Sequence, residues 1–142
     1  MIARMRTIEG YAALVIALLL AHASGALASE FDGSEKLRCV PTDATECSGA
    51  GECQRVTVEE INIPKWIYVD FKKKELSGTN TEGVAETTAV ENVHIMEGKT
   101  ILQGAESGRA WSMVIDQTSG DFTAAVAGEG TGFVLLGICQ KR

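Results

Sequence analysis

Four cysteines restrict what this 142-residue chain can fold into more than any other feature of its sequence. Three of them, Cys39, Cys47 and Cys53, lie close together, and the fourth, Cys139, lies near the last residue. Their spacings match neither a zinc knuckle nor a Cys-x-x-Cys redox motif. An even number of cysteines in a small domain of an oxidising compartment indicates disulfides, and four cysteines allow three connectivities.

We predict the pairs Cys47–Cys53 and Cys39–Cys139. The first would close a short, glycine-containing loop, and the second would join the first strand of a closed meander to its last strand. A bridge that closes a loop of about 100 residues constrains the unfolded chain by roughly 4–5 kcal/mol. A metal site and a reactive thiol pair are the alternatives to this structural role.

The N-terminal residues are typical of a secretory signal peptide, which places the chain in such a compartment. Arg4 and Arg6 precede an apolar run over residues 12–21, and an Ala-x-Ala pattern ends at Ala28. This layout predicts a signal peptide over residues 1–28 that is cleaved after Ala28. The alternative is an uncleaved anchor, because residues 11–28 have about the minimum length for a membrane span. Cleavage would leave one domain over residues 29–142, in the periplasm or outside the cell.

The charge of the chain limits its partners. Removing residues 1–28 would remove Arg4, Arg6 and Glu9, which leaves 11 basic and 18 acidic residues and a net charge of −7. Nucleic acids and anionic membrane surfaces bind clustered basic residues, so we expect neither as a partner. We expect no stable membrane span once the signal peptide is removed, because no later stretch is apolar enough.

Short runs rich in β-branched and aromatic residues, separated by glycines, indicate an all-β fold. Tight turns are predicted at residues 97–99, 107–108 and 116–120, where glycine can supply positive φ. Residues 72–83 (KKKELSGTNTEG) predict a polar loop, and residues 133–139 (FVLLGIC) a central or barrel-closing strand. We therefore predict a small antiparallel barrel or barrel-like meander of about seven or eight strands, stapled by disulfides.

No motif for catalysis, metal binding or a cofactor stands out. The chain lacks the Gly-x-Ser-x-Gly pattern of a nucleophile elbow, and we interpret His94 as a partly buried strand residue. Trp66 and Trp111 are expected to fill the core. Whether the protein is an enzyme stays open, although the sequence favours a non-enzymatic role.

One glycine-rich stretch is a candidate binding loop: Gly128, Glu129, Gly130, Thr131 and Gly132. It lacks the strand–loop–helix context of a phosphate-binding loop, so a flexible turn is the simpler interpretation. Turns at the mouth of a barrel nevertheless form many ligand or partner contacts.

Several segments resemble small secreted proteins of Gram-negative bacteria. They are FDGSEKLRC (31–39), the EC…GEC pair (46–53), INIPKWIYVDF (61–71) and ILQGAESGRAWSMVIDQTSGDFTAAVAGEGTGFVLLGIC (101–139). The resemblance covers nearly all of residues 29–142 and implies a periplasmic or secreted location. The family has no established activity, so no catalytic residue carries over from it.

These observations together favour a non-enzymatic binding or interaction module of the cell envelope, which holds an envelope protein or a small ligand. A lipocalin-like carrier of a small apolar ligand is the first alternative, and it would require a hollow interior. An envelope enzyme is the second, and it would require polar groups that converge in a cleft.

Overall fold

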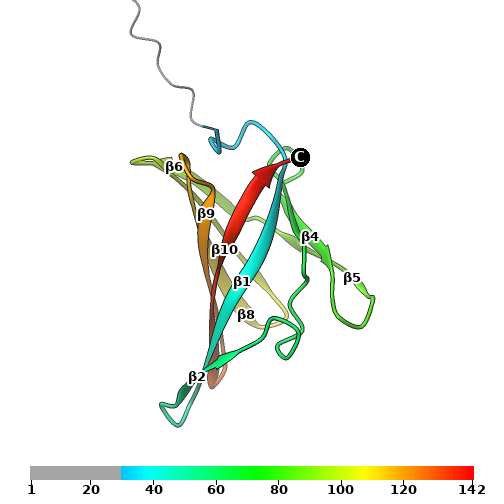
Figure 1. The fold of residues 1–142 in the computed structure, drawn as a ribbon, viewed down its shortest axis with the longest axis vertical. Coiled ribbons are helices and arrows are strands. Elements are labelled where there is room, and N and C mark those ends of the chain that lie inside the picture. The colour runs from blue at the N-terminus through cyan, green and yellow to red at the C-terminus, as the bar shows by residue number, and fades with distance from the viewer. Residues whose placement is uncertain (1–29) are drawn as a thin grey trace, which may run out of the picture.

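The computed structural model describes residues 30–142, which form a curled antiparallel sheet without any helix in that range (Figure 1). The predicted signal peptide, residues 1–28, lies outside the described residues. The strands are β1 (Leu37–Ser48), β2 (Cys53–Val56), β3 (Ile67–Asp70), β4 (Glu75–Thr79), β5 (Ala85–Ala89), β6 (Asn92–Met96), β7 (Lys99–Glu106), β8 (Arg109–Asp116), β9 (Asp121–Gly128) and β10 (Thr131–Lys141). The all-β, barrel-like fold is confirmed, with ten strands rather than seven or eight.

The predicted hairpin turns lie where the glycines suggested. Glu97 and Gly98 have φ of 50° and 73°, and Ser107 and Gly108 have φ of 51° and 78°. Two successive positive φ values characterise the two-residue turn whose twist matches that of paired strands. Gly120 ends the turn between β8 and β9 with φ of 78°. A side chain there would approach the Cys139 carbonyl oxygen to 2.6 Å, so only glycine fits.

Strand β1 organises the sheet. Nine strands follow the order β5-β4-β3-β1-β10-β9-β8-β7-β6, and β2 also pairs with β1. One side of β1 pairs with β10 along its whole length, with a single irregularity between Pro41 and Asp43. On its other side, β3 pairs with residues 37–39 and β2 with residues 44–47. Strand β10 is therefore central, as predicted from its apolar sequence.

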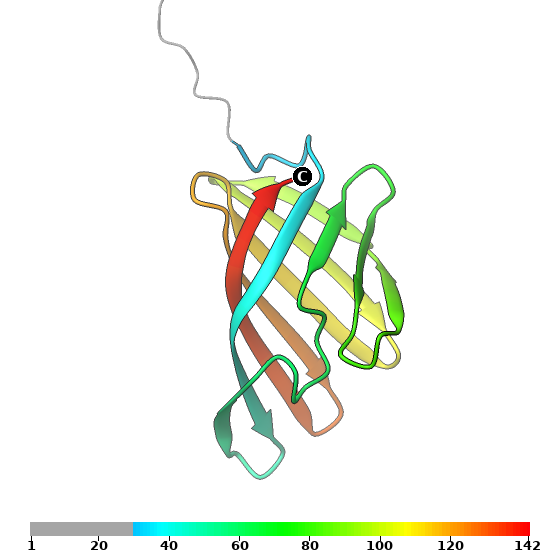
Figure 2. The same cartoon turned by 45° about the vertical axis from the view of Figure 1, so that its right-hand side comes forward.

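The curl of the sheet brings the edge strand β5 against β7, the strand that pairs with the other edge strand, β6 (Figure 2). The amide of Glu91 donates to the carbonyl of Gln103 over 2.9 Å, which joins the β5–β6 connection to β7. Residue 104 must be glycine, because a Cβ there would lie 2.4 Å from the carbonyl oxygen of Ala89. We call this junction between β5 and β7 the seam. No strand ladder crosses it in the described residues, so the sheet is an open barrel.

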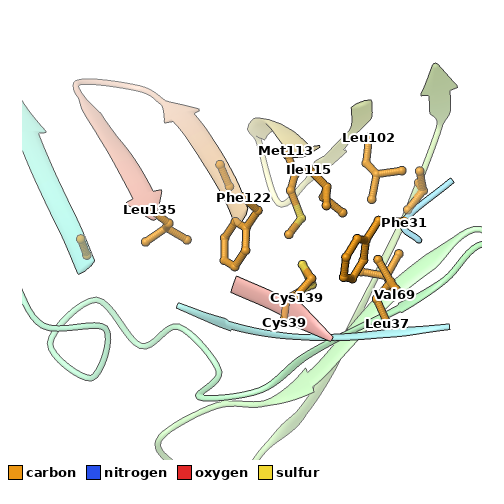
Figure 3. Close-up of a cluster of buried hydrophobic side chains, with 13 residues drawn as sticks. Phe31, Leu37, Cys39, Val69, Leu102, Met113, Ile115, Phe122, Leu135 and Cys139 are labelled. Atoms are coloured by element: carbon orange, nitrogen blue, oxygen red, sulfur yellow. A yellow bond between two sulfur atoms is a disulfide. The ribbon is translucent and has the colours of Figure 1, made fainter. Parts of the chain in front are cut away.

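Part of the hydrophobic core lies at one end of the barrel, which we call the upper end; Figure 3 shows Phe31, Leu37 and the Cys39–Cys139 disulfide close together in this part. Strands β1 and β10 contribute Leu37, Cys39 and Cys139, each at most 1% exposed. Phe31, which precedes the first strand, packs into the same cluster and plugs this end. Its carbonyl accepts a hydrogen bond of 2.7 Å from the buried Thr100 hydroxyl. The segment before β1 is therefore part of the core.

Both disulfides join the pairs predicted from the sequence. Cys39 lies opposite Cys139 in the β1–β10 ladder, and Cys47 lies opposite Cys53 in the β1–β2 hairpin. The first is buried at the upper end, whereas Cys53 is exposed at the other end. We call this opposite end, where the β1–β2 and β9–β10 turns lie, the lower end.

Three local predictions were wrong. Residues 75–79 form strand β4 instead of a loop, because Leu76 joins the interior while Gly78 lets Pro64 and Trp66 pass close above the strand. His94 is exposed on the edge strand β6. Trp66 is 38% exposed instead of filling the core. Its ring stacks under the Arg38 guanidinium, whose Cζ lies 4.7 Å from the centroid of the Trp66 ring.

Candidate ligand cavity

The lower half of the barrel holds a half-open cavity of about 330 Å³. Its wall extends from Leu135 on the central strand β10 across β9 and β8 to residues 86–88 of β5. This volume lies at the lower limit of the pockets that hold small molecules, about 300–1,000 Å³. The barrel is thus packed at its upper end and hollow at its lower end.

The part of the cavity wall on β8, β9 and β10 is mainly apolar because side chains alternate along each strand. Polar groups in the rest of the wall come from Asn62, Ser77, Thr87 and Thr88. On β8, Trp111 and Met113 point inward, and the register pairs them with Val126 and Ala124 of β9. Ala124 is small, so the interior at this level stays unfilled where the upper end carries Phe122. A single small residue at an inward position therefore contributes to the cavity.

A loop between β2 and β3 forms a further part of the wall. Thr57 and Glu60 bond reciprocally: the Thr57 amide donates to Glu60 Oε2 over 2.7 Å, and the Glu60 amide donates to Thr57 Oγ1 over 3.2 Å. The hydrogen bonds from the backbone and then the side chain of Thr57 lower the pKa of the Glu60 carboxyl. This turn positions Ile61 and Ile63, which line the cavity.

Charged groups lie only at the rim of the cavity wall. Among the lining residues they are Glu86, Glu106 and Arg109. Glu86 Oε1 accepts a hydrogen bond of 2.8 Å from Nδ2 of the Asn80 side chain. The stem of Arg109 crosses above Gly128 at the lower end. A ligand in the cavity would therefore contact both apolar and polar side chains, while the charged lining residues are exposed to solvent.

The seam forms the side wall of the cavity. Trp111 Nε1 donates to the Thr88 hydroxyl of β5 over 3.3 Å, across the gap between the sheet edges. The same indole ring lies against Gly104. This wall is therefore joined by the Trp111–Thr88 hydrogen bond, by the backbone hydrogen bond from Glu91 to Gln103 and by packing, without a strand ladder.

The predicted binding loop lies beside the cavity rather than in its wall. Gly128 to Gly132 form the β9–β10 turn at the lower end, and none of them lines the cavity. Gly128 affects the rim only indirectly, through its contact with Arg109. All four cysteines are in disulfides.

The residues that line the cavity were not identified as a site in the sequence. Their signal was present but weak: Trp111, Met113 and Ala124 occupy inward positions in alternating strands. The sequence does not reveal that the plug at Phe31 fills only one end. That asymmetry depends on where the segment before β1 lies.

Two further observations concern metal binding and membrane-spanning helices. Within residues 30–142, no group of three or more His, Cys, Asp or Glu side chains is placed to hold a metal ion. In the same range, no helix is long and apolar enough to cross a membrane.

Comparison with known proteins found no matching family model, curated protein or solved structure. The resemblance to small secreted bacterial proteins therefore stays a prediction.

Proposed function

We propose that the protein is a non-enzymatic binding module that holds a small, largely apolar molecule in the lower half of its barrel. The observation that supports this most is the cavity of about 330 Å³, whose wall is more apolar than polar and whose charged lining residues are exposed. Pockets of this size and composition are the usual sites for small ligands. Of the functions considered from the sequence, the carrier of a small apolar ligand gains the most support.

The rigidity of the scaffold supports the same proposal. The cavity wall is built on paired strands, and the Cys47–Cys53 disulfide fixes the hairpin beside it. A preformed cavity lowers the ordering cost of binding. Two disulfides are compatible with an oxidising compartment, and we propose a periplasmic or secreted location on that ground.

An enzymatic role has less support. The only histidine of the described residues, His94, is exposed on the edge strand β6, away from the lining of the cavity. The acidic lining residues Glu86 and Glu106 lie at the rim with Arg109. We therefore propose binding without chemistry as the function of this cavity.

Titration with a neutral fluorescent probe, N-phenyl-1-naphthylamine, tests the proposal. The oxidised protein should give a saturable rise in emission as the probe enters an apolar site. Ala124→Phe, which fills the cavity from β9, should weaken probe binding by about tenfold or more, equivalent to about 1.4 kcal/mol.

Ala50→Phe is the matched control, because it adds the same ring in the exposed β1–β2 turn. It should leave the affinity unchanged. The absence of saturable binding, or equal affinity of the protein and its Ala124→Phe variant, would overturn the proposal. Urea unfolding of both variants establishes that each is folded before the titration.

A further inference from the structure

The outer surface of β10 carries a ridge of exposed apolar side chains. Val134, Leu136 and Ile138 point away from the interior and are 43%, 48% and 41% exposed. They occupy alternate positions of the central strand, where the opposite face carries Leu135 and Cys139 of the core. Large apolar residues in such a row on an outer face are uncommon unless something covers them.

A trough of small residues lies beside this ridge. On the neighbouring strand β9, Thr123, Ala125 and Ala127 point outward. The register places Thr123 beside Leu136 and Ala125 beside Val134. A row of large side chains thus runs parallel to a row of small ones, about 5 Å away across the sheet.

The surface around this ridge and trough is uncharged except at its upper edge, where the exposed Asp121 lies opposite Ile138 in the register. We call it the outer face, and its twelve residues are Ile101, Gln103, Ala105, Ala110, Ser112, Val114, Thr123, Ala125, Ala127, Val134, Leu136 and Ile138. Ion pairs border it: Lys99–Asp116 at its upper edge and Arg55–Asp43 beyond β10. The Asp121 carboxylate is turned toward the Ser119 hydroxyl, which donates to it over 2.9 Å. An apolar centre with a charged border is the usual anatomy of an interface.

We propose that the outer face binds a second copy of this chain. A two-fold axis along the strand direction, lying in the interface above the line between β9 and β10, would place the β10 of each copy over the β9 of the other. The ridge of one copy would then fill the trough of its partner, with Leu136 over Thr123 and Val134 over Ala125. Such an isologous contact is self-complementary, and two-fold dimers are the commonest assemblies.

Charge favours a second copy at this face over other faces of the molecule. The chain has a net charge of −6, so two copies repel one another wherever their acidic surfaces meet. The twelve residues of the outer face contribute no charge to the contact, and Asp121 at its upper edge would lie under Ile138 of the other copy. Aligned packing of two sheets through such faces is a common arrangement.

The size of the face makes the dimer weak. With strands about 4.8 Å apart and outward residues about 6.8 Å apart, the outer face covers on the order of 400 Å². A standard interface buries about 800 Å² on each partner. The curl of the sheet makes the face convex and centres the contact on β9 and β10. We therefore expect a reversible dimer that forms only at high protein concentration.

Sedimentation velocity from micromolar to millimolar concentration tests this proposal. The average mass of the oxidised protein should rise toward that of a dimer, and Leu136→Glu should keep it monomeric throughout. Val84→Glu is the matched control, because Val84 is also an exposed apolar residue, 53% exposed, and lies outside the outer face. A protein that stays monomeric at every concentration would overturn the proposal, as would a Leu136→Glu variant that dimerises normally.

A mixing experiment tests the ridge-in-trough arrangement itself. Thr123→Lys should also be monomeric alone, because its lysine would meet Leu136 of the other copy. An equimolar mixture of the Thr123→Lys and Leu136→Glu variants should form a heterodimer, in which the new lysine meets the new glutamate and the second contact is unchanged. Monomers in the mixture would overturn this arrangement. The result does not depend on whether the cavity binds a ligand.

Discussion

The upper and lower ends of the barrel are built from the same long strands, but one is packed and the other is hollow. At the upper end, Phe31 enters from outside the sheet and packs with the buried Cys39–Cys139 disulfide. At the lower end, the described residues leave a cavity, and the loop before β3 forms part of its wall. The difference separates the end where Phe31 joins the core from the end that holds the proposed binding site.

Removal of the two disulfides should give the largest contrast between the ends. Cys39 and Cys139 are 100 residues apart, so their replacement by alanine should lower the free energy of unfolding by about 4–5 kcal/mol. Cys47 and Cys53 are 6 residues apart, and the same change should cost about 2 kcal/mol. Urea unfolding of both double variants measures these losses. Equal losses would contradict the view that the upper end carries most of the stability.

Changes of side-chain volume should lower the free energy of unfolding by different amounts at the two ends. Phe31→Ala empties a packed site and should lower the free energy of unfolding by about 3–4 kcal/mol. Ala124→Phe adds volume where space exists and should cost less than about 1.5 kcal/mol. The urea midpoints of the two variants give the comparison. A larger loss for Ala124→Phe than for Phe31→Ala would show that the lower end is packed in solution.

Acid should lower the free energy of unfolding through Asp116 at the upper end, by a smaller amount than the substitutions above. The Lys99 ammonium and then the amides of Ser119 and Thr118 hold the pKa of Asp116 well below its usual range. A carboxyl whose folded pKa lies below its unfolded value stabilises the fold at neutral pH. This contribution is lost as the pH falls below about 4 and through the lowered pKa.

Asp116→Asn should therefore flatten the decline of stability between neutral pH and about pH 2, as followed by the urea midpoint. Glu60→Gln provides the comparison at the lower end, where the pKa of the carboxyl is also lowered by hydrogen bonds. The Asp116→Asn variant also loses the ion pair, so its stability at neutral pH should be lower. A decline as steep as that of the unmodified protein would show that Asp116 is not responsible.

Local signals in the sequence were enough to predict the all-β fold, the hairpin turns and the disulfides, but not every strand. Gly98, Gly108 and Gly120 fix turns through their positive φ, which depends on a few neighbouring residues. The cysteine pairs follow from the same meander, because Cys39 and Cys139 lie on the strands expected to adjoin. These features require no knowledge of how the sheet curls.

The cavity and the outer face could not be predicted in the same way, because they depend on which face of each strand the curl turns inward. In FVLLGIC (133–139) every second residue is exposed, although the segment reads as buried on both faces. Trp66 reads as a core residue but packs outside under Arg38. Apolar residues on both faces of a strand leave the direction of the curl undetermined.

The position of β10 has a consequence for the order of events in folding. It is the last of the ten strands in the chain and also the central one, and it pairs along its length with β1, the first. Contacts of such long sequence separation make assembly slow, because a large loop must close before they form. The hairpins of β6 to β9 can form while a chain is still emerging, but the sheet cannot curl until β10 arrives. We therefore expect the central strand of the sheet to be completed in a late step of folding.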